Sequence, residues 1–156
     1  MTLAHMQSKE EYKPSAAQIP AASAPVSAEA ALRSVHASNL PALLDRLHIG
    51  LLVSTNQAGK VILIRHAQGT LNTYLRAFAK PMGIAADAAR LAIGGTSTAW
   101  YYRNMPALAQ KLGPGGMHDA RYLPQRIHVT DDIDIHELAW GGDGELWLFN
   151  TRFCCL

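Results

Sequence analysis

The sequence predicts an all-β fold of antiparallel β-propeller-like repeats, incomplete in this chain and preceded by one short helix. Two observations carry this prediction. Apolar runs alternate with turn stretches such as "NQAG" and "GGDG" from residue 51 onward, which is typical of β-hairpins. In addition, "GIAADAARLAIGG" and "ELAWGGDGELWLFN" share one plan: an apolar strand, a turn that contains aspartate, and a second apolar strand. Such repeated units are typical of propeller blades, which bury their faces against neighbouring blades.

Two segments are expected, a disordered leader over residues 1–36 and a β domain over residues 37–156. Alanine, serine and proline dominate the leader, where only a short helix near Ala28–Val35 is expected. The β domain begins with a predicted helix in "SNLPALLDRLHIG", which Ser38 or Asn39 can cap and which Gly50 ends. Its leucines recur at helical spacing, so all four are expected in the core: Leu40, Leu43, Leu44 and Leu47.

Three hairpins and one further strand follow the predicted helix. The first predicted hairpin is "GLLVSTNQAGKVILIRH", with its turn at Gln57–Gly59. The second joins Met82–Ala86 to Arg90–Ile93, and the single strand "STAWYYRN" follows it. The third joins Ile135–Trp140 to Glu145–Asn150. The aromatic side chains of the last hairpin are expected in its core: Trp140, Trp147 and Phe149. Between these strands we expect a brief helix at Pro106–Leu112 and then a long irregular connection rich in polar groups.

Four stretches resemble a known family. They are "LLVSTNQAGKVILIR", "PMGIAAD", "RLAIGG" and "HVTDDIDIHELAWGGDGELWLFNTRFCCL", and they resemble the N-terminal portion of the bacterial proteins grouped as domain of unknown function 4915. The resemblance runs from about Ser38 to Leu156. It implies a propeller-like all-β fold and no established activity. Members of that family continue well beyond this point, so the chain is expected to be a fragment or truncated copy; the alternative is a small self-contained β domain.

Composition and charge exclude several classes of function. The chain is 49% hydrophobic and 17% charged, which indicates a globular protein. Its formal net charge of +2 predicts no nucleic-acid or anionic-membrane partner, and no apolar run is long enough for a membrane span. The two cysteines are sequence neighbours, so no disulfide framework is expected and a cytoplasmic location is predicted.

Carboxylates and histidines near the last hairpin suggest a metal site. If residues 131–137 are extended, Asp132, Asp134 and His136 share one face of the strand and can bind a divalent ion. Carboxylates suit calcium or manganese, and imidazole adds affinity for zinc or iron. The spacing matches no established zinc or calcium motif, and the alternative is a solvated strand edge.

The long polar connection supplies the candidate ligand-binding residues, which are His118, Asp119, Arg121 and His128. No G-x-S-x-G elbow is present, so no catalytic residue is assigned and it is left open whether the protein is an enzyme. The first hypothesis is that the domain, in its complete form, is a small-ligand binding module. The alternatives are a metal-dependent hydrolase or lactonase-like enzyme, by analogy with propellers that hold a central ion, and a scaffold that binds a protein partner.

Overall fold

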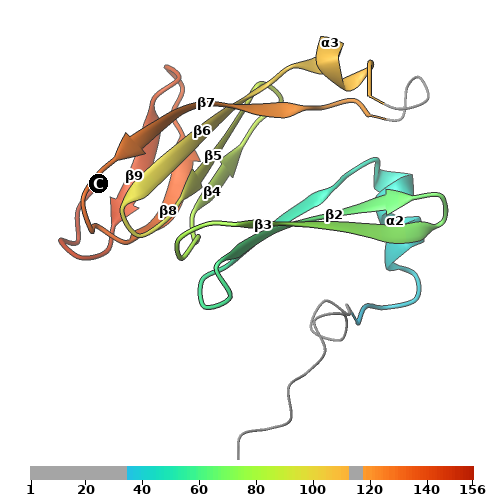
Figure 1. The fold of residues 1–156 in the computed structure, drawn as a ribbon, viewed down its shortest axis with the longest axis horizontal. Coiled ribbons are helices and arrows are strands. Elements are labelled where there is room, and N and C mark those ends of the chain that lie inside the picture. Colours follow the sequence, from blue (N-terminus) through green and yellow to red (C-terminus); the bar gives the residue numbers. More distant parts are fainter. Residues whose placement is uncertain (1–34, 113–117) are drawn as a thin grey trace, which may run out of the picture. The chain divides into compact units, whose positions relative to one another are not determined.

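Antiparallel strands make up most of the structure, a computed structural model that describes residues 35–112 and 118–156. These residues form nine strands in three antiparallel sheets, with two short helices, so the all-β prediction is confirmed (Figure 1). All of these elements belong to one unit, Ala37–Leu156. The leader expected over residues 1–36 lies outside the described residues except for its last two, and so does the helix expected near Ala28–Val35 except for its last residue.

The first described element is the helix α2 (Leu40–Leu47). It ends at His48, whose backbone is left-handed with φ 52° and whose N–H donates to the carbonyl of Asp45 at 3.0 Å. The expected core stripe is only partly correct. Leu44 is buried, whereas Leu43 and Leu47 are exposed, because the described strands β2 and β3 pack against one side of α2.

The first sheet has the order β1 (Leu51–Thr55), β2 (Lys60–Ala67) and β3 (Thr70–Ala77). The hairpin of β1 and β2 is confirmed, whereas β3 was not predicted. Gln68 and Gly69 connect β2 to β3 with positive φ values of 50° and 80°. Two left-handed residues form the tight turn whose twist suits a two-residue hairpin. The sequence therefore continues as a third strand in a stretch for which no element was predicted.

The second sheet is a four-stranded meander. Its order is β4 (Ile84–Ala86), β5 (Arg90–Gly94), β6 (Thr98–Asn104) and β7 (Tyr122–Val129), with the helix α3 (Pro106–Ala109) between β6 and β7. The expectation that β7 would be part of an irregular connection is wrong. Pro124 is accommodated because β7 is an edge strand and its register with β6 shifts between Tyr101 and Tyr102.

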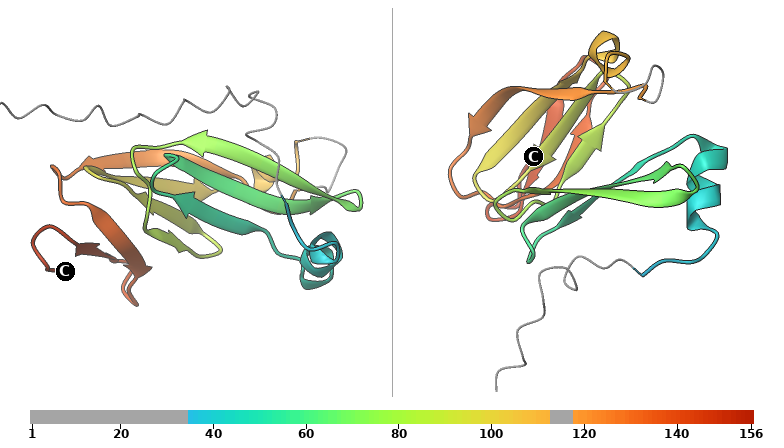
Figure 2. Two further views of the ribbon diagram at one scale, coloured as in Figure 1. Left: turned by 90° about the horizontal axis from the view of Figure 1, so that it is seen from below. Right: turned by 45° about the vertical axis from the view of Figure 1, so that its right-hand side comes forward.

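The third sheet is the hairpin of β8 (Ile135–Trp140) and β9 (Leu146–Asn150), as predicted. β8 lies against β4 and β5, so the hairpin covers part of the second sheet (Figure 2). The expected extended segment from residue 131 is wrong at its start. Asp131 and Asp134 have left-handed backbones, with φ 66° and 52°, and β8 therefore begins only at Ile135.

The aromatic residues of this hairpin differ from the expected core. Trp147 is 51% exposed and Phe149 is also exposed, whereas Trp140 is partly buried. Trp147 pairs with Ala139 across the hairpin, and so lies on the opposite face from Leu138. Leu138 faces the second sheet near Gly94, which leaves Trp147 and Phe149 on the uncovered face.

The main core lies between the first and second sheets. Val61 from β2 packs with Leu91, Ile93 and Tyr102 from β5 and β6. Phe78 follows β3 and meets Trp100 of β6 edge to face, with ring centroids 5.7 Å apart. The three sheets do not form a closed ring within the described residues. Neither helix in the described ranges has the length and apolar character that a membrane-spanning helix requires.

Candidate functional site

A cleft of about 750 Å³ lies between the inner faces of the first and second sheets. Its volume is within the range of small-molecule binding pockets. Residues of α2, all three strands of the first sheet, β4–β6 and the beginning of β7 line it. The apolar part of the lining includes Leu52, Val61, Leu63, Phe78, Leu91 and Ile93.

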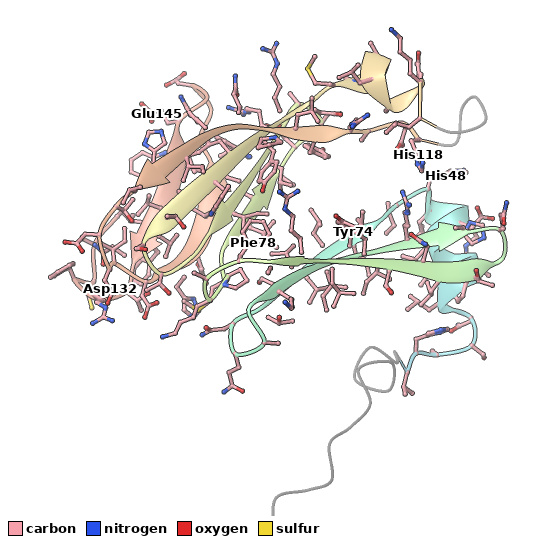
Figure 3. The ribbon with its side chains drawn as sticks, viewed as in Figure 1. His48, Tyr74, Phe78, His118, Asp132 and Glu145 are labelled. Carbon is pink, nitrogen blue, oxygen red and sulfur yellow. The ribbon has the colours of Figure 1, made fainter. Side chains whose placement is uncertain are left out.

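Strand alternation decides which side chains of the first sheet reach the cleft. Val61 and Leu63 of β2 are register partners of Arg76 and Tyr74 of β3, so these four residues share one face. That face is turned toward the second sheet, because Val61 belongs to the core between the sheets. Figure 3 shows Tyr74, with Phe78 beyond it, along β3 on the side of the cleft.

Arg65 and His118 form the polar contact that crosses the cleft. The Nε of Arg65 donates to Oδ1 of Asn72 at 2.9 Å, and its Nη1 lies 3.3 Å from Nδ1 of His118. A guanidinium can only donate, so Nδ1 of His118 accepts and a neutral ring carries its proton on Nε2. Arg65 and His118 thereby fix each other's orientation.

His66 and Asp45 connect β2 to α2 at the same cleft. Nδ1 of His66 lies 3.0 Å from Oδ1 of Asp45, and the N–H of Gly69 donates to its Nε2 at 2.8 Å. An Nε2 that accepts from an amide carries no proton, so the ring is the neutral tautomer with its proton on Nδ1. His66 thus connects α2 to the turn between β2 and β3.

Tyr102 is a buried residue in the lining of the cleft. The residue is 6% exposed, and its hydroxyl has no hydrogen-bond partner among the described residues. Burial raises the pKa of Tyr102, and the positive charge of Arg76 acts in the opposite direction. Arg76 is solvent-exposed and makes no hydrogen bond or ion pair within the described part of the chain. Two polar groups of the cleft lining thus have no partner among the described residues.

Tyr122, at the beginning of β7, has its hydrogen bond satisfied. Its hydroxyl donates to the carbonyl of Asp87 at 2.8 Å. Burial raises the pKa of Tyr122, and the negative charges of Asp87 and Asp119 add to that effect. Tyr122 therefore serves as an anchor for β7 at the edge of the cleft.

The structure divides the predicted ligand-binding residues into two groups. His118 and Asp119 line the cleft, as a ligand site requires. Arg121 does not line it; its backbone N–H donates to Oδ1 of Asn104 at 2.9 Å. His128 stacks on Tyr101 with ring centroids 5.0 Å apart, on the other face of the second sheet from Tyr102.

The predicted metal ligands are not brought together. Asp132 pairs with Arg152, with 2.6 Å between Oδ2 and Nη2. Oδ1 of Asp134 is buried without a partner among the described residues, and His136 is exposed. Left-handed backbones at Asp131 and Asp134 interrupt the alternation that would have aligned the three side chains. The described ranges hold no group of three His, Cys, Asp or Glu residues placed to bind a metal, and the metal site stays a prediction.

Sequence reasoning missed Arg65, Arg76 and Tyr102. The alternation of the strand could have indicated Arg65 as a cleft residue, because Arg65 follows Val61 and Leu63 at every second position of an apolar face. Arg76 occupies the same kind of position between Tyr74 and Phe78. A polar group on the inner face of a strand marks either a satisfied internal contact or a site.

The comparisons with known proteins bear on the identity of the chain. No curated protein and no solved structure matches it. The sequence profile of one family, described as Domain of unknown function (DUF4915), matches residues 38–156, which is most of the chain and all of the strands above. The chain therefore belongs to the DUF4915 family.

Proposed function

We propose that this protein is a small-ligand binding module whose site is the cleft between β1–β3 and β4–β7. The single observation that carries the proposal is the hydroxyl of Tyr102, which is buried in the lining of this cleft without a partner among the described residues. An unsatisfied buried hydroxyl costs about 1–3 kcal/mol. A ligand that bonds to it would remove that cost.

The composition of the cleft supports the same proposal. Ligand pockets combine mostly apolar walls with a few polar groups that fix orientation. Here the walls come from Val61, Leu91 and Ile93, and the polar groups come from His118, Arg76 and Tyr102. Because these groups belong to different strands and loops, a ligand in contact with all of them would hold the two sheets together.

A propeller-like arrangement of the sheets is the second part of the proposal. β4–β7 is a four-stranded antiparallel meander, which is the composition of a propeller blade. β8 lies against β4 and β5, as the first strand of a following blade would. On this reading β1–β3 belongs to one blade and β4–β7 to the next, and the ligand cleft lies between two blades.

Two fluorescent probes with the same ring system test the ligand site: neutral N-phenyl-1-naphthylamine and anionic 8-anilinonaphthalene-1-sulfonate. We expect at least one probe to bind the full chain saturably, with one site per chain. Ala86→Trp should weaken this binding about tenfold or more, because Ala86 lines the cleft and the indole would fill it. Ala139→Trp is the matched control, since Ala139 is exposed on the uncovered face of β8.

Comparison of probe binding to the two tryptophan variants decides whether the cleft is the site. Saturable binding that Ala86→Trp weakens and Ala139→Trp leaves unchanged supports the cleft as the site. Binding of neither probe, or equal effects of the two tryptophan variants, would contradict it. Far-UV circular dichroism of both variants checks that the sheets are intact.

A further inference from the structure

We infer that the ligand of this cleft is an organic anion with an apolar body, whose acidic group is bound by Arg76 and Tyr102. The inference rests on the proposed function, because it names the chemical class of the ligand for the same cleft. It follows from which polar groups of the lining make hydrogen bonds or ion pairs with other described residues and which do not.

Arg76 is the free cation of the described lining. It lies on β3 opposite Val61, on the strand face that is turned toward the second sheet. No hydrogen bond or ion pair within the described ranges holds its guanidinium. A guanidinium offers a planar fork of donors that matches a carboxylate or phosphate, and such charge-assisted bonds are stronger than neutral ones.

Tyr102 adds a second donor within reach of the same group. Both residues line the cleft, and Val61, the register partner of Arg76, belongs to the same core cluster as Tyr102. The hydroxyl is buried and unpaired within the described structure, so it is available to donate to an acidic oxygen. One anion bonded to both groups would satisfy a buried donor and neutralise a cation at once.

The other charged groups of the lining do not compete for this position. Arg65 is already bonded to Asn72 and His118. Asp45 is in contact with His66. The remaining carboxylate of the described lining, Asp119, precedes β7, whereas Arg76 lies on β3 and Tyr102 on β6. The proposed anion site therefore lies on strands that contribute no carboxylate to the described lining.

The walls beside this pair are apolar. Val61, Leu91 and Ile93 surround Tyr102 in the core, and Phe78 packs against the same cluster. Such walls favour a hydrocarbon or aromatic body over a small hydrated ion, because burying apolar surface is the favourable term. The class that fits both features is an organic acid with an apolar body, either a carboxylate or a phosphate.

The two fluorescent probes test this class directly, because they differ by one sulfonate group. We expect the anionic probe to bind the full chain about tenfold more tightly than the neutral probe. Arg76→Gln should abolish that preference, so that the two probes bind with about equal affinity. Arg103→Gln is the matched control: Arg103 is next to Tyr102 on β6 but points to the other face of the sheet.

Competition identifies the acidic group. We expect naphthaleneacetate to displace the anionic probe at concentrations about tenfold below those needed for naphthaleneacetamide, its neutral counterpart. Naphthyl phosphate, measured beside them, shows whether a carboxylate or a phosphate is preferred. Better displacement by either acid than by the amide supports the inference, and equal displacement by the acids and the amide overturns it.

The outcomes separate this inference from the proposed function. If the neutral probe binds in the cleft as tightly as the anionic probe, the ligand site stands and the anionic class is overturned. If Arg65→Gln rather than Arg76→Gln removes the preference, the anionic class stands and the assignment of the acidic group to Arg76 is overturned. If neither probe binds, the proposed function fails, and the inference that rests on it fails too.

Discussion

The guanidinium carbon of Arg90 lies 4.0 Å from the centroid of the Trp140 ring. The same guanidinium bonds to Oδ2 of Asp87 through Nε at 2.9 Å and Nη2 at 2.7 Å, and Nη1 donates to the carbonyl of Gly144 at 3.1 Å. Asp87 precedes β5, whereas Trp140 and Gly144 belong to the hairpin of β8 and β9. Arg90 thus links the second sheet to the third through a cation–π contact and a hydrogen bond, while Asp87 of the second sheet holds the guanidinium in place.

Replacement of Arg90 should loosen the contact between these sheets. Arg90→Met keeps an aliphatic stem beside Trp140 but removes the cation and its hydrogen bonds. We expect a loss of about 1 kcal/mol in the free energy of unfolding, because the side chain is partly exposed and its contacts are screened by water. Urea unfolding followed by near-UV circular dichroism measures this. Arg103→Met, at the position paired with Arg90 on β6, should change little, and an equal loss in both variants would contradict the link.

The ion pair of Asp87 predicts how stability depends on pH. The hydrogen bond from Arg90 is the largest of the effects that hold the pKa of the Asp87 carboxyl below its ordinary value. Because the folded state binds this proton less readily than the unfolded state, the contribution of Asp87 is present above about pH 4 and is lost as the pH falls through the lowered pKa.

Asp87→Asn tests this dependence, because the amide oxygen can still accept from the N–H groups of Ala89 and Arg90. Urea midpoints of the two proteins should differ by a constant amount from pH 7 down to about pH 5 and should converge below about pH 4. A difference that stays constant to the lowest measurable pH would show that Asp87 does not contribute through its charge.

Much of the strand pattern could be predicted, because the apolar runs of β1, β2, β5, β6, β8 and β9 are bounded by turn residues. β3 was missed because its turn is Gln68–Gly69, where the usual signal is asparagine or aspartate before glycine. β7 was missed because Pro124 is normally absent from strand interiors, and only the register shift on an edge strand accommodates it.

The candidate site could be predicted only in part, because no local motif encodes it. His118 and Asp119 stood out as polar residues in a connection, but Arg76 and Tyr102 come to line one cleft only when two sheets pack face to face. The metal hypothesis depended on an extended backbone through Asp134. Aspartate tolerates the left-handed conformation that the structure has there, and sequence alternation gives no warning of it.

Removal of the Tyr102 hydroxyl should stabilise the unliganded protein. Tyr102→Phe replaces a buried, unpaired hydroxyl with hydrogen in a site that is otherwise apolar, so we expect a gain of about 1 kcal/mol. Tyr122→Phe is the matched comparison and should lose about 1 kcal/mol, because its hydroxyl donates to the carbonyl of Asp87. Chemical denaturation measures both variants. A loss in Tyr102→Phe as large as that in Tyr122→Phe would mean that the Tyr102 hydroxyl has a partner in solution.

The packing of the third sheet onto the second depends on the absence of a side chain at Gly94. A Cβ built there would lie 2.5 Å from Cγ2 and 2.9 Å from Cβ of Ile135, which is fully buried and cannot move aside. Gly94→Ala should therefore destabilise the fold by about 1–3 kcal/mol through overpacking.

Gly142→Ala is the control, since a Cβ there meets no atom within 4 Å, and it should change stability by less than about 0.5 kcal/mol. In thermal unfolding, the double variant Gly94→Ala with Ile135→Ala should be less destabilised than the sum of the two single variants, because the second change removes the group with which the first collides. Strict additivity would mean that β8 does not rest on Gly94 in solution.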